Sequence, residues 1–113
     1  AADPAAYTAL IEEAQSLRGR RRIAKYEEAL AANPNGVEAL TELAWFRLNR
    51  GQNEQAAQYA ERASTLDPTN SKAWITLGAA RQALGNASGA REAYQACVDQ
   101  GQGRYVSDCR LML

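Results

Sequence analysis

The chain has 113 residues, the length of one domain, and a chain of this size buries roughly two-thirds of its unfolded surface. Thirteen basic and thirteen acidic residues cancel, so the chain lacks the positive field of a general nucleic-acid-binding protein. It has no histidine, the commonest general base and metal ligand, and no apolar stretch long enough to span a membrane. We therefore predict that it is not an enzyme, with no cofactor or metal site, no nucleic-acid partner and no membrane insertion.

The first predicted element is a helical pair over residues 5–34. Apolar residues recur at helical spacing over 5–17 and again over 22–32. Between these helices, the basic run from Arg18 to Arg22 is interpreted as a turn. A solvated turn is the favoured interpretation, and a contact with an acidic partner or a phosphate is the alternative.

Two further helical pairs follow, and turn residues separate their members. Gly51 and Gly85 interrupt the helical pattern within the pairs. Pro34 and Pro68 stop the second helices of the first and second pairs, because proline cannot continue the hydrogen-bond ladder. The predicted helices of these two pairs are residues 37–50, 54–66, 71–84 and 87–99.

The second and third pairs are internal repeats, since Pro34 and Pro68 lie 34 residues apart and the same shift aligns both helices. The third unit contains Trp74-x₂-Leu77-Gly78 followed by Ala90-x₃-Tyr94, and the second contains Leu40-x₂-Leu43-Ala44, Ala56-x₃-Ala60 and Pro68. These residues resemble the tetratricopeptide repeat, whose pattern is W-x₂-L-G-x₂-Y, then A-x₃-F, then P. Both units depart from it at Arg47 and Arg81, where the family has an aromatic residue.

The resemblance implies an all-α fold, a right-handed superhelical stack of antiparallel helix pairs. Its repeats are expected over about 5–34, 37–68 and 71–100, with the first one degenerate. A capping helix is expected over about 104–113, and the alanine-rich start suggests a fragment of a longer protein. The apolar residues of the capping helix are expected to cover the third unit; they are Tyr105, Val106, Cys109, Met112 and Leu113.

The two cysteines allow two interpretations. Cys97 and Cys109 both lie on faces that are predicted to be packed, so they are either two small buried apolar residues or a disulfide that fixes the cap. A disulfide would indicate an oxidising compartment such as the periplasm. Without one, a cytoplasmic location is favoured.

In the family that the chain resembles, the first helices of successive units line a concave groove that holds a partner. The resemblance therefore implies a non-catalytic protein-interaction module with a protein or peptide partner, and the alternative is a structural or self-association module. The arginine- and alanine-rich composition suggests a bacterial source. The candidate groove residues are Glu12, Glu38, Thr41, Trp45, Leu48, Asn49, Lys72, Ile75, Ala79 and Gln82, with Thr8, Gln15, Glu42 and Thr76 beside them.

Trp45 is the strongest candidate, because it lies off the packed stripe and tryptophan is enriched in binding hot spots. The alternative is that it fills space beside Phe46. Some members of the family hold a chaperone's terminal carboxylates with a clamp of Lys, Asn and Arg. The matching positions here contain one such residue and two acids, so we predict no carboxylate clamp; they are Thr8, Glu12, Glu42, Lys72 and Thr76.

Overall fold

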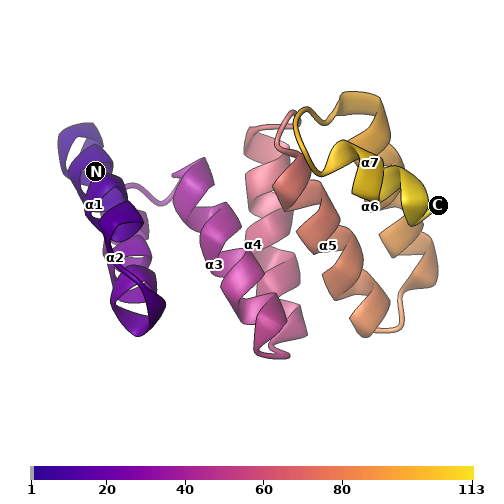
Figure 1. Ribbon diagram of the computed structural model, residues 1–113, viewed down its shortest axis with the longest axis horizontal. Coiled ribbons are helices and arrows are strands. Elements are labelled where there is room, and N and C mark those ends of the chain that lie inside the picture. Colours follow the sequence, from indigo (N-terminus) through magenta and orange to yellow (C-terminus); the bar gives the residue numbers. More distant parts are fainter. Residues whose placement is uncertain (1) are drawn as a thin grey trace.

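The computed structural model describes residues 2–113, which form helices joined by short connections and contain no strand. The helices make three consecutive antiparallel pairs and a short final helix (Figure 1). The all-α prediction is therefore confirmed. The helices are α1 (Pro4–Ser16), α2 (Gly19–Ala32), α3 (Val37–Asn49), α4 (Asn53–Leu66), α5 (Ser71–Ala83), α6 (Ala87–Gln100) and α7 (Val106–Leu111).

Polar caps and glycines set the helix ends. Asp3, Asn70 and Asn86 cap α1, α5 and α6, because each side-chain oxygen accepts a backbone N–H from three residues further along the chain. Gly51 and Gly85 follow the ends of α3 and α5 with φ angles of 75° and 81°, a region that other residues rarely adopt. These are the two glycines at which the sequence predicted breaks.

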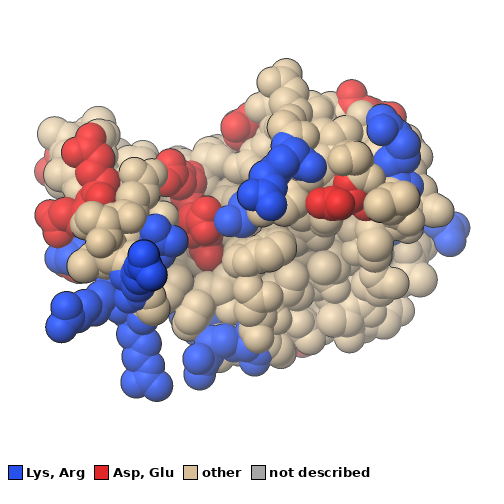
Figure 2. Space-filling view, in the orientation of Figure 1, with Lys and Arg blue, Asp and Glu red and all other residues tan. Residues whose placement is uncertain are grey.

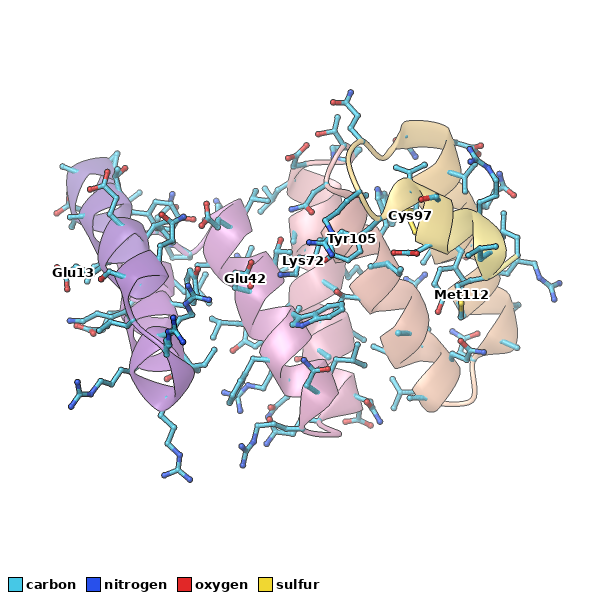
Figure 3. All side chains as sticks on the ribbon, in the orientation of Figure 1. Glu13, Glu42, Lys72, Cys97, Tyr105 and Met112 are labelled. Atoms are coloured by element: carbon cyan, nitrogen blue, oxygen red, sulfur yellow. A yellow bond between two sulfur atoms is a disulfide. The ribbon has the colours of Figure 1, made fainter. Side chains whose placement is uncertain are left out.

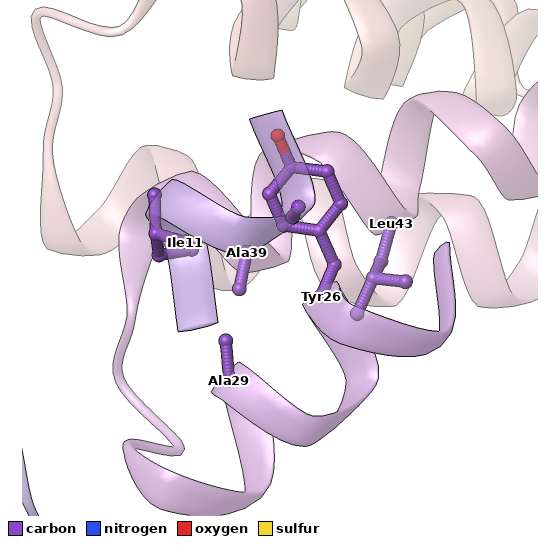
Figure 4. Close-up of a cluster of buried hydrophobic side chains, with 6 residues drawn as sticks. Ile11, Tyr26, Ala29, Ala39 and Leu43 are labelled. Atoms are coloured by element: carbon purple, nitrogen blue, oxygen red, sulfur yellow. The ribbon is translucent and has the colours of Figure 1, made fainter. Parts of the chain in front are cut away.

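The hydrophobic core consists of small clusters of buried side chains, which lie within and between the helix pairs. Figure 4 shows the first, in which Ile11 of α1 and Tyr26 and Ala29 of α2 meet Ala39 and Leu43 of α3. All five side chains are buried. This cluster fixes the first pair against the second, mainly through the packing of α2 on α3.

A repeated ion pair links successive units. Arg47 of α3 lies 3.8 Å from Glu27 of α2, and Arg81 of α5 lies 3.8 Å from Glu61 of α4. Both arginine side chains are about a quarter exposed, so their stems cover apolar surface while their charged ends reach the preceding unit. At both positions where the family pattern has an aromatic residue, an arginine therefore covers the apolar surface and also pairs with the preceding unit.

The basic run differs from the prediction, because α2 begins at Gly19 and includes Arg20, Arg21 and Arg22. The predicted turn from Arg18 to Arg22 is wrong in extent. Arg22 explains part of the difference: its Nε and Nη2 donate to the carbonyl oxygens of Ala14 and Gln15, each at 3.0 Å. Arg22 therefore satisfies two carbonyl oxygens at the end of α1, and the connection between α1 and α2 is shorter than predicted.

The final helix also differs from the prediction. A disulfide joins Cys97 of α6 to Cys109 of α7, with 6.2 Å between their Cα atoms, and both residues are fully buried. The expectation that Met112 and Leu113 cover the third unit is wrong, because 47% and 49% of their surface stays exposed. Since α7 ends at Leu111, these two residues lie beyond the packed turn of the cap.

Candidate binding surface

The first helices of the three pairs share one face of the molecule. In Figure 1, α1, α3 and α5 lie toward the viewer, while α2, α4 and α6 lie behind them. The short α7 packs on α5 and α6 and continues the front row. We call this face, formed by α1, α3, α5 and α7, the groove face.

Trp45 lies at the middle of the groove face. Its ring centre is 6.0 Å from the ring centre of Tyr105, which precedes α7, and 5.2 Å from Nζ of Lys72. Lys72 also donates to both carboxylate oxygens of Glu42, at 2.9 and 3.0 Å. Figure 3 shows Glu42, Lys72 and Tyr105 following one another across α3, α5 and the start of α7. Trp45 is partly exposed and belongs to none of the buried clusters of the described chain.

A polar cleft of about 380 Å³ opens beside this group, between the starts of α3 and α5. Glu38, Glu42 and Asp67 line it, with Lys72 as the cation. Glu38 also accepts a hydrogen bond of 2.8 Å from Nε2 of Gln15. Three carboxylates against one ammonium leave the cleft with an excess of two negative charges.

Two tyrosines beside the cleft respond to these carboxylates. Burial raises the pKa of Tyr26 above its usual value, and the charges of Glu42 and Glu38 raise it further, against the opposing effect of Arg22. Burial also raises the pKa of Tyr7, against the opposing effect of the hydrogen bond that its hydroxyl accepts from the backbone N–H of Ala39, and the charge of Glu38 adds to the rise. The carboxylate of Glu38 thus acts on one tyrosine of each helix of the first pair.

Two threonines of the predicted groove set, Thr41 and Thr76, are buried, although Thr41 lines the polar cleft between α3 and α5. Thr41 is 4% exposed and Thr76 is fully buried. The hydroxyl of Thr41 donates to the carbonyl of Val37, and the hydroxyl of Thr76 to that of Lys72, so both are satisfied within their own helices. Thr41 also accepts from Nδ2 of Asn70, which ties α3 to the start of α5.

The remaining predicted groove residues reach the surface to different degrees. Ile75 packs partly against the cluster around the disulfide, so α7 covers some of it. Gln82 accepts a hydrogen bond of 3.2 Å from the hydroxyl of Tyr94. Of the full set, Glu12, Glu38, Asn49 and Gln82 are exposed, and Trp45, Leu48, Lys72, Ile75 and Ala79 are partly exposed.

Sequence reasoning missed Tyr105 as a groove residue and placed it on the covered face of the cap. The structure ties the preceding loop to the start of α5, because Gln102 donates to the carbonyl of Thr69 and accepts from the hydroxyl of Ser71. These bonds carry Tyr105 toward Trp45. The predicted capping helix was a signal that could have identified Tyr105. A helix that continues the row of α1, α3 and α5 brings its first residues to the groove face.

Tetratricopeptide repeat models match residues 47–108 and residues 25–58. The first match alone covers more than half of the 113 residues. The chain belongs to the tetratricopeptide repeat family.

Curated relatives of this tetratricopeptide repeat domain include eukaryotic and bacterial proteins. The heat-shock protein cognate co-chaperone sgt12 of Aspergillus fumigatus is 39% identical over 79 residues, which is 69% of this chain and 23% of sgt12. The TPR repeat-containing protein PA0015 of Pseudomonas aeruginosa is 44% identical over 48 residues, which is 42% of this chain and 46% of PA0015. The domain thus spans less than half of either relative.

Solved structures show the same fold. The Sgt2 TPR domain from Aspergillus fumigatus superposes with a TM-score of 0.74 at 30% identity, covering 98% of this chain and 80% of that one. The first TPR domain of Spaghetti (RPAP3), bound to the HSP90 peptide SRMEEVD, has a TM-score of 0.80 at 20% identity, with coverage of 98% and 93%. Within residues 2–113, no helix has the length and apolarity needed to cross a membrane.

Proposed function

We propose that this domain is a non-catalytic protein-interaction module whose groove face holds a segment of a partner protein. The observation that carries the proposal is Trp45, a partly exposed aromatic at the middle of the groove face with Tyr105 and Lys72 beside it. A large side chain in such a position gains affinity when a partner completes its burial. Membership of the tetratricopeptide repeat family and the likeness to the Sgt2 domain support the same function.

The charge of the groove face favours a partner segment with basic side chains. Glu12 and Glu38 are exposed, and the cleft between α3 and α5 has an excess of negative charge. Lys72 already pairs with Glu42, so it is not free to hold a terminal carboxylate. We therefore expect no measurable binding of the acidic peptide SRMEEVD, the ligand of the RPAP3 domain.

A second candidate function is docking onto another copy or another domain of the parent protein. Exposed apolar side chains at the α7 end of the stack favour it, since Leu111 is 83% exposed and Met112 and Leu113 are about half exposed. Light scattering over a range of concentrations separates the two functions, because self-association predicts a mass that rises with concentration. A bacterial parent protein remains a prediction from composition.

The test of the groove uses peptides selected by phage display against the whole domain. Each selected peptide is measured by calorimetry against the wild type, Trp45→Ala and a matched surface variant, Arg91→Ala on α6. We expect Trp45→Ala to weaken binding by roughly 2 kcal/mol, the cost of losing a central anchor. Arg91→Ala should leave it unchanged. Equal affinities for the wild type and Trp45→Ala would refute the proposed site.

A further inference from the structure

A group of arginines lies outside the groove face, at the opposite edge of the first two helix pairs. Arg20, Arg47 and Arg50 line a cleft of about 320 Å³ between α2 and α3, and Phe46 and Ile23 provide its apolar wall. Figure 2 shows blue basic side chains gathered along the lower edge beneath α1 and α3, and red acidic ones above them. We call this region the basic edge; Arg20, Arg47 and Arg50 line its cleft, and Arg18 and Arg21 flank Arg20 at the start of α2.

The positive charge of the basic edge is poorly compensated. Glu27 is the carboxylate that lines the cleft, and its Oε1 lies 3.8 Å from Nη2 of Arg47. Within residues 2–113, the exposed Arg20 and Arg21 form no hydrogen bond or ion pair through their side chains. Three guanidinium groups against one carboxylate leave the cleft with an excess of two positive charges.

The position of these arginines also works against the fold. Arg20 and Arg21 lie in the first turn of α2, which contains no acidic residue and has no side-chain cap. The start of a helix carries a partial positive charge, so cations there are unfavourable. The other arginine of this turn, Arg22, is used in the fold because it satisfies the end of α1. The fold therefore gives no reason for the charges of Arg20 and Arg21.

We propose that the basic edge is a second contact surface, which binds an acidic segment of a partner protein. Guanidinium groups bind carboxylates through paired hydrogen bonds, and the cleft offers Arg20 and Arg50 on an exposed rim. Ile23 is partly buried and accepts an apolar side chain of the same segment. This surface is separate from the groove face, so it extends the proposed function to a partner with two contacts.

The chemistry of the cleft favours an acidic protein segment over a nucleic acid. The guanidinium carbons of Arg47 and Arg50 already lie 5.8 and 5.5 Å from the centre of the Phe46 ring, so a base would have to displace them to stack. Phe46 is the one aromatic residue that lines the cleft. The zero net charge of the chain also gives no long-range attraction for a polyanion.

The experiment measures the anisotropy of a fluorescent peptide in which glutamates alternate with leucine and phenylalanine. The variant is the charge reversal Arg20→Glu with Arg50→Glu, and the matched control reverses the exposed Arg91 and Arg110 on α6 and α7. We expect the wild type, the control and Trp45→Ala to bind the peptide alike, and the variant to bind at least tenfold more weakly. The variant should unfold at a temperature close to that of the wild type, because Arg20→Glu puts a favourable acid at the start of α2 while Arg50→Glu puts an unfavourable one at the end of α3.

The inference would be overturned by a wild type that does not bind the peptide, by a charge-reversal variant that binds as tightly as the wild type, by an equal loss in the control pair, or by an oligothymidine strand that binds as tightly as the peptide. A loss of peptide binding in Trp45→Ala would also overturn it, because the peptide would then occupy the groove face. If the basic edge does not bind the acidic peptide, the groove proposal is unaffected, since it is tested with other peptides whose binding should weaken in Trp45→Ala.

Discussion

At the scale of single residues, Trp45 and its neighbour Ala44 on α3 differ in burial. Ala44 is fully buried between helices, while Trp45 turns onto the groove face and stays partly exposed. Its contacts there are a cation and an aromatic ring, Lys72 and Tyr105, instead of the packed aliphatic side chains of the core. We therefore expect Trp45 to contribute more to binding than to folding.

Trp45→Ala should therefore change stability little. We expect its free energy of unfolding to fall by about 1 kcal/mol or less, measured by urea titration. If Trp45 instead fills space beside Phe46, the loss should be roughly 3–5 kcal/mol, as for tryptophan truncations in cores. Trp45→Phe serves as the control, since it keeps an aromatic ring at the same place.

The buried tyrosines predict a loss of stability at alkaline pH. Tyr26 is 3% exposed, and burial raises its pKa above the usual 10.0; Tyr94 shows the same effect. As pH rises past 10, the unfolded chain loses these protons first, so the native state holds more protons and the free energy of unfolding falls. Thermal melts between pH 9 and pH 11 should fall less steeply for Tyr26→Phe than for the wild type. Parallel curves would contradict this assignment.

At the scale of helices, pairs of residues 34 apart solve one packing problem in two ways. In the second unit Ala44 and Ala60 are both fully buried. In the third unit the equivalent residues are Gly78 and Tyr94, and a Cβ atom on Gly78 would overlap the Tyr94 ring. The glycine leaves room for the ring, so the two residues form one packing unit.

Gly78→Ala should therefore destabilise the domain, although alanine is the better helix former by about 1 kcal/mol. Overpacking against a buried ring costs roughly 1–3 kcal/mol, which outweighs that gain. In a Tyr94→Ala background the overlap disappears, so the same Gly78→Ala change should stabilise. A double-mutant cycle by chemical denaturation checks this reversal of sign. Equal effects in both backgrounds would show that the ring and the glycine are not coupled.

The disulfide carries a second prediction at this scale. Cys97 and Cys109 are 12 residues apart, and closing a loop of that size contributes about 2–4 kcal/mol. The bond is buried, so reduction requires prior unfolding, followed by refolding in reductant. We expect the reduced wild type to melt at a lower temperature than the oxidised form, and Cys109→Ser to melt alike with and without reductant. An unchanged melting temperature would show that packing alone holds the cap.

At the scale of the whole molecule, much of the architecture could be predicted from the sequence, because glycines, prolines and polar caps act locally. Gly51, Gly85 and Pro68 set helix ends through their own backbone chemistry. The burial of Thr41 could not be predicted, since a helical position at the margin of a face becomes buried or exposed through contacts with other helices. Tyr105 depended on a loop held by the start of α5, a long-range contact that spacing does not reveal.

The molecule separates its charges although their sum is zero. Acidic side chains lie over the groove face beside α1 and α3, and arginines lie along the basic edge (Figure 2). Such an arrangement orients a partner that has basic and acidic parts more than it attracts one at long range. The groove face is the main contact surface that we propose, because the partly exposed Trp45 lies there.

The most direct test of that claim is an NMR titration of the two tryptophan indole N–H signals with a peptide selected by display. Nε1 of Trp74 donates to the carbonyl of Pro68 at 2.7 Å, so its signal serves as an internal reference. We predict that the Trp45 signal shifts in proportion to the bound fraction while the Trp74 signal stays in place. An unmoved Trp45 signal at saturation, with shifts in the backbone signals of α2, α4 and α6, would contradict a binding surface on the groove face.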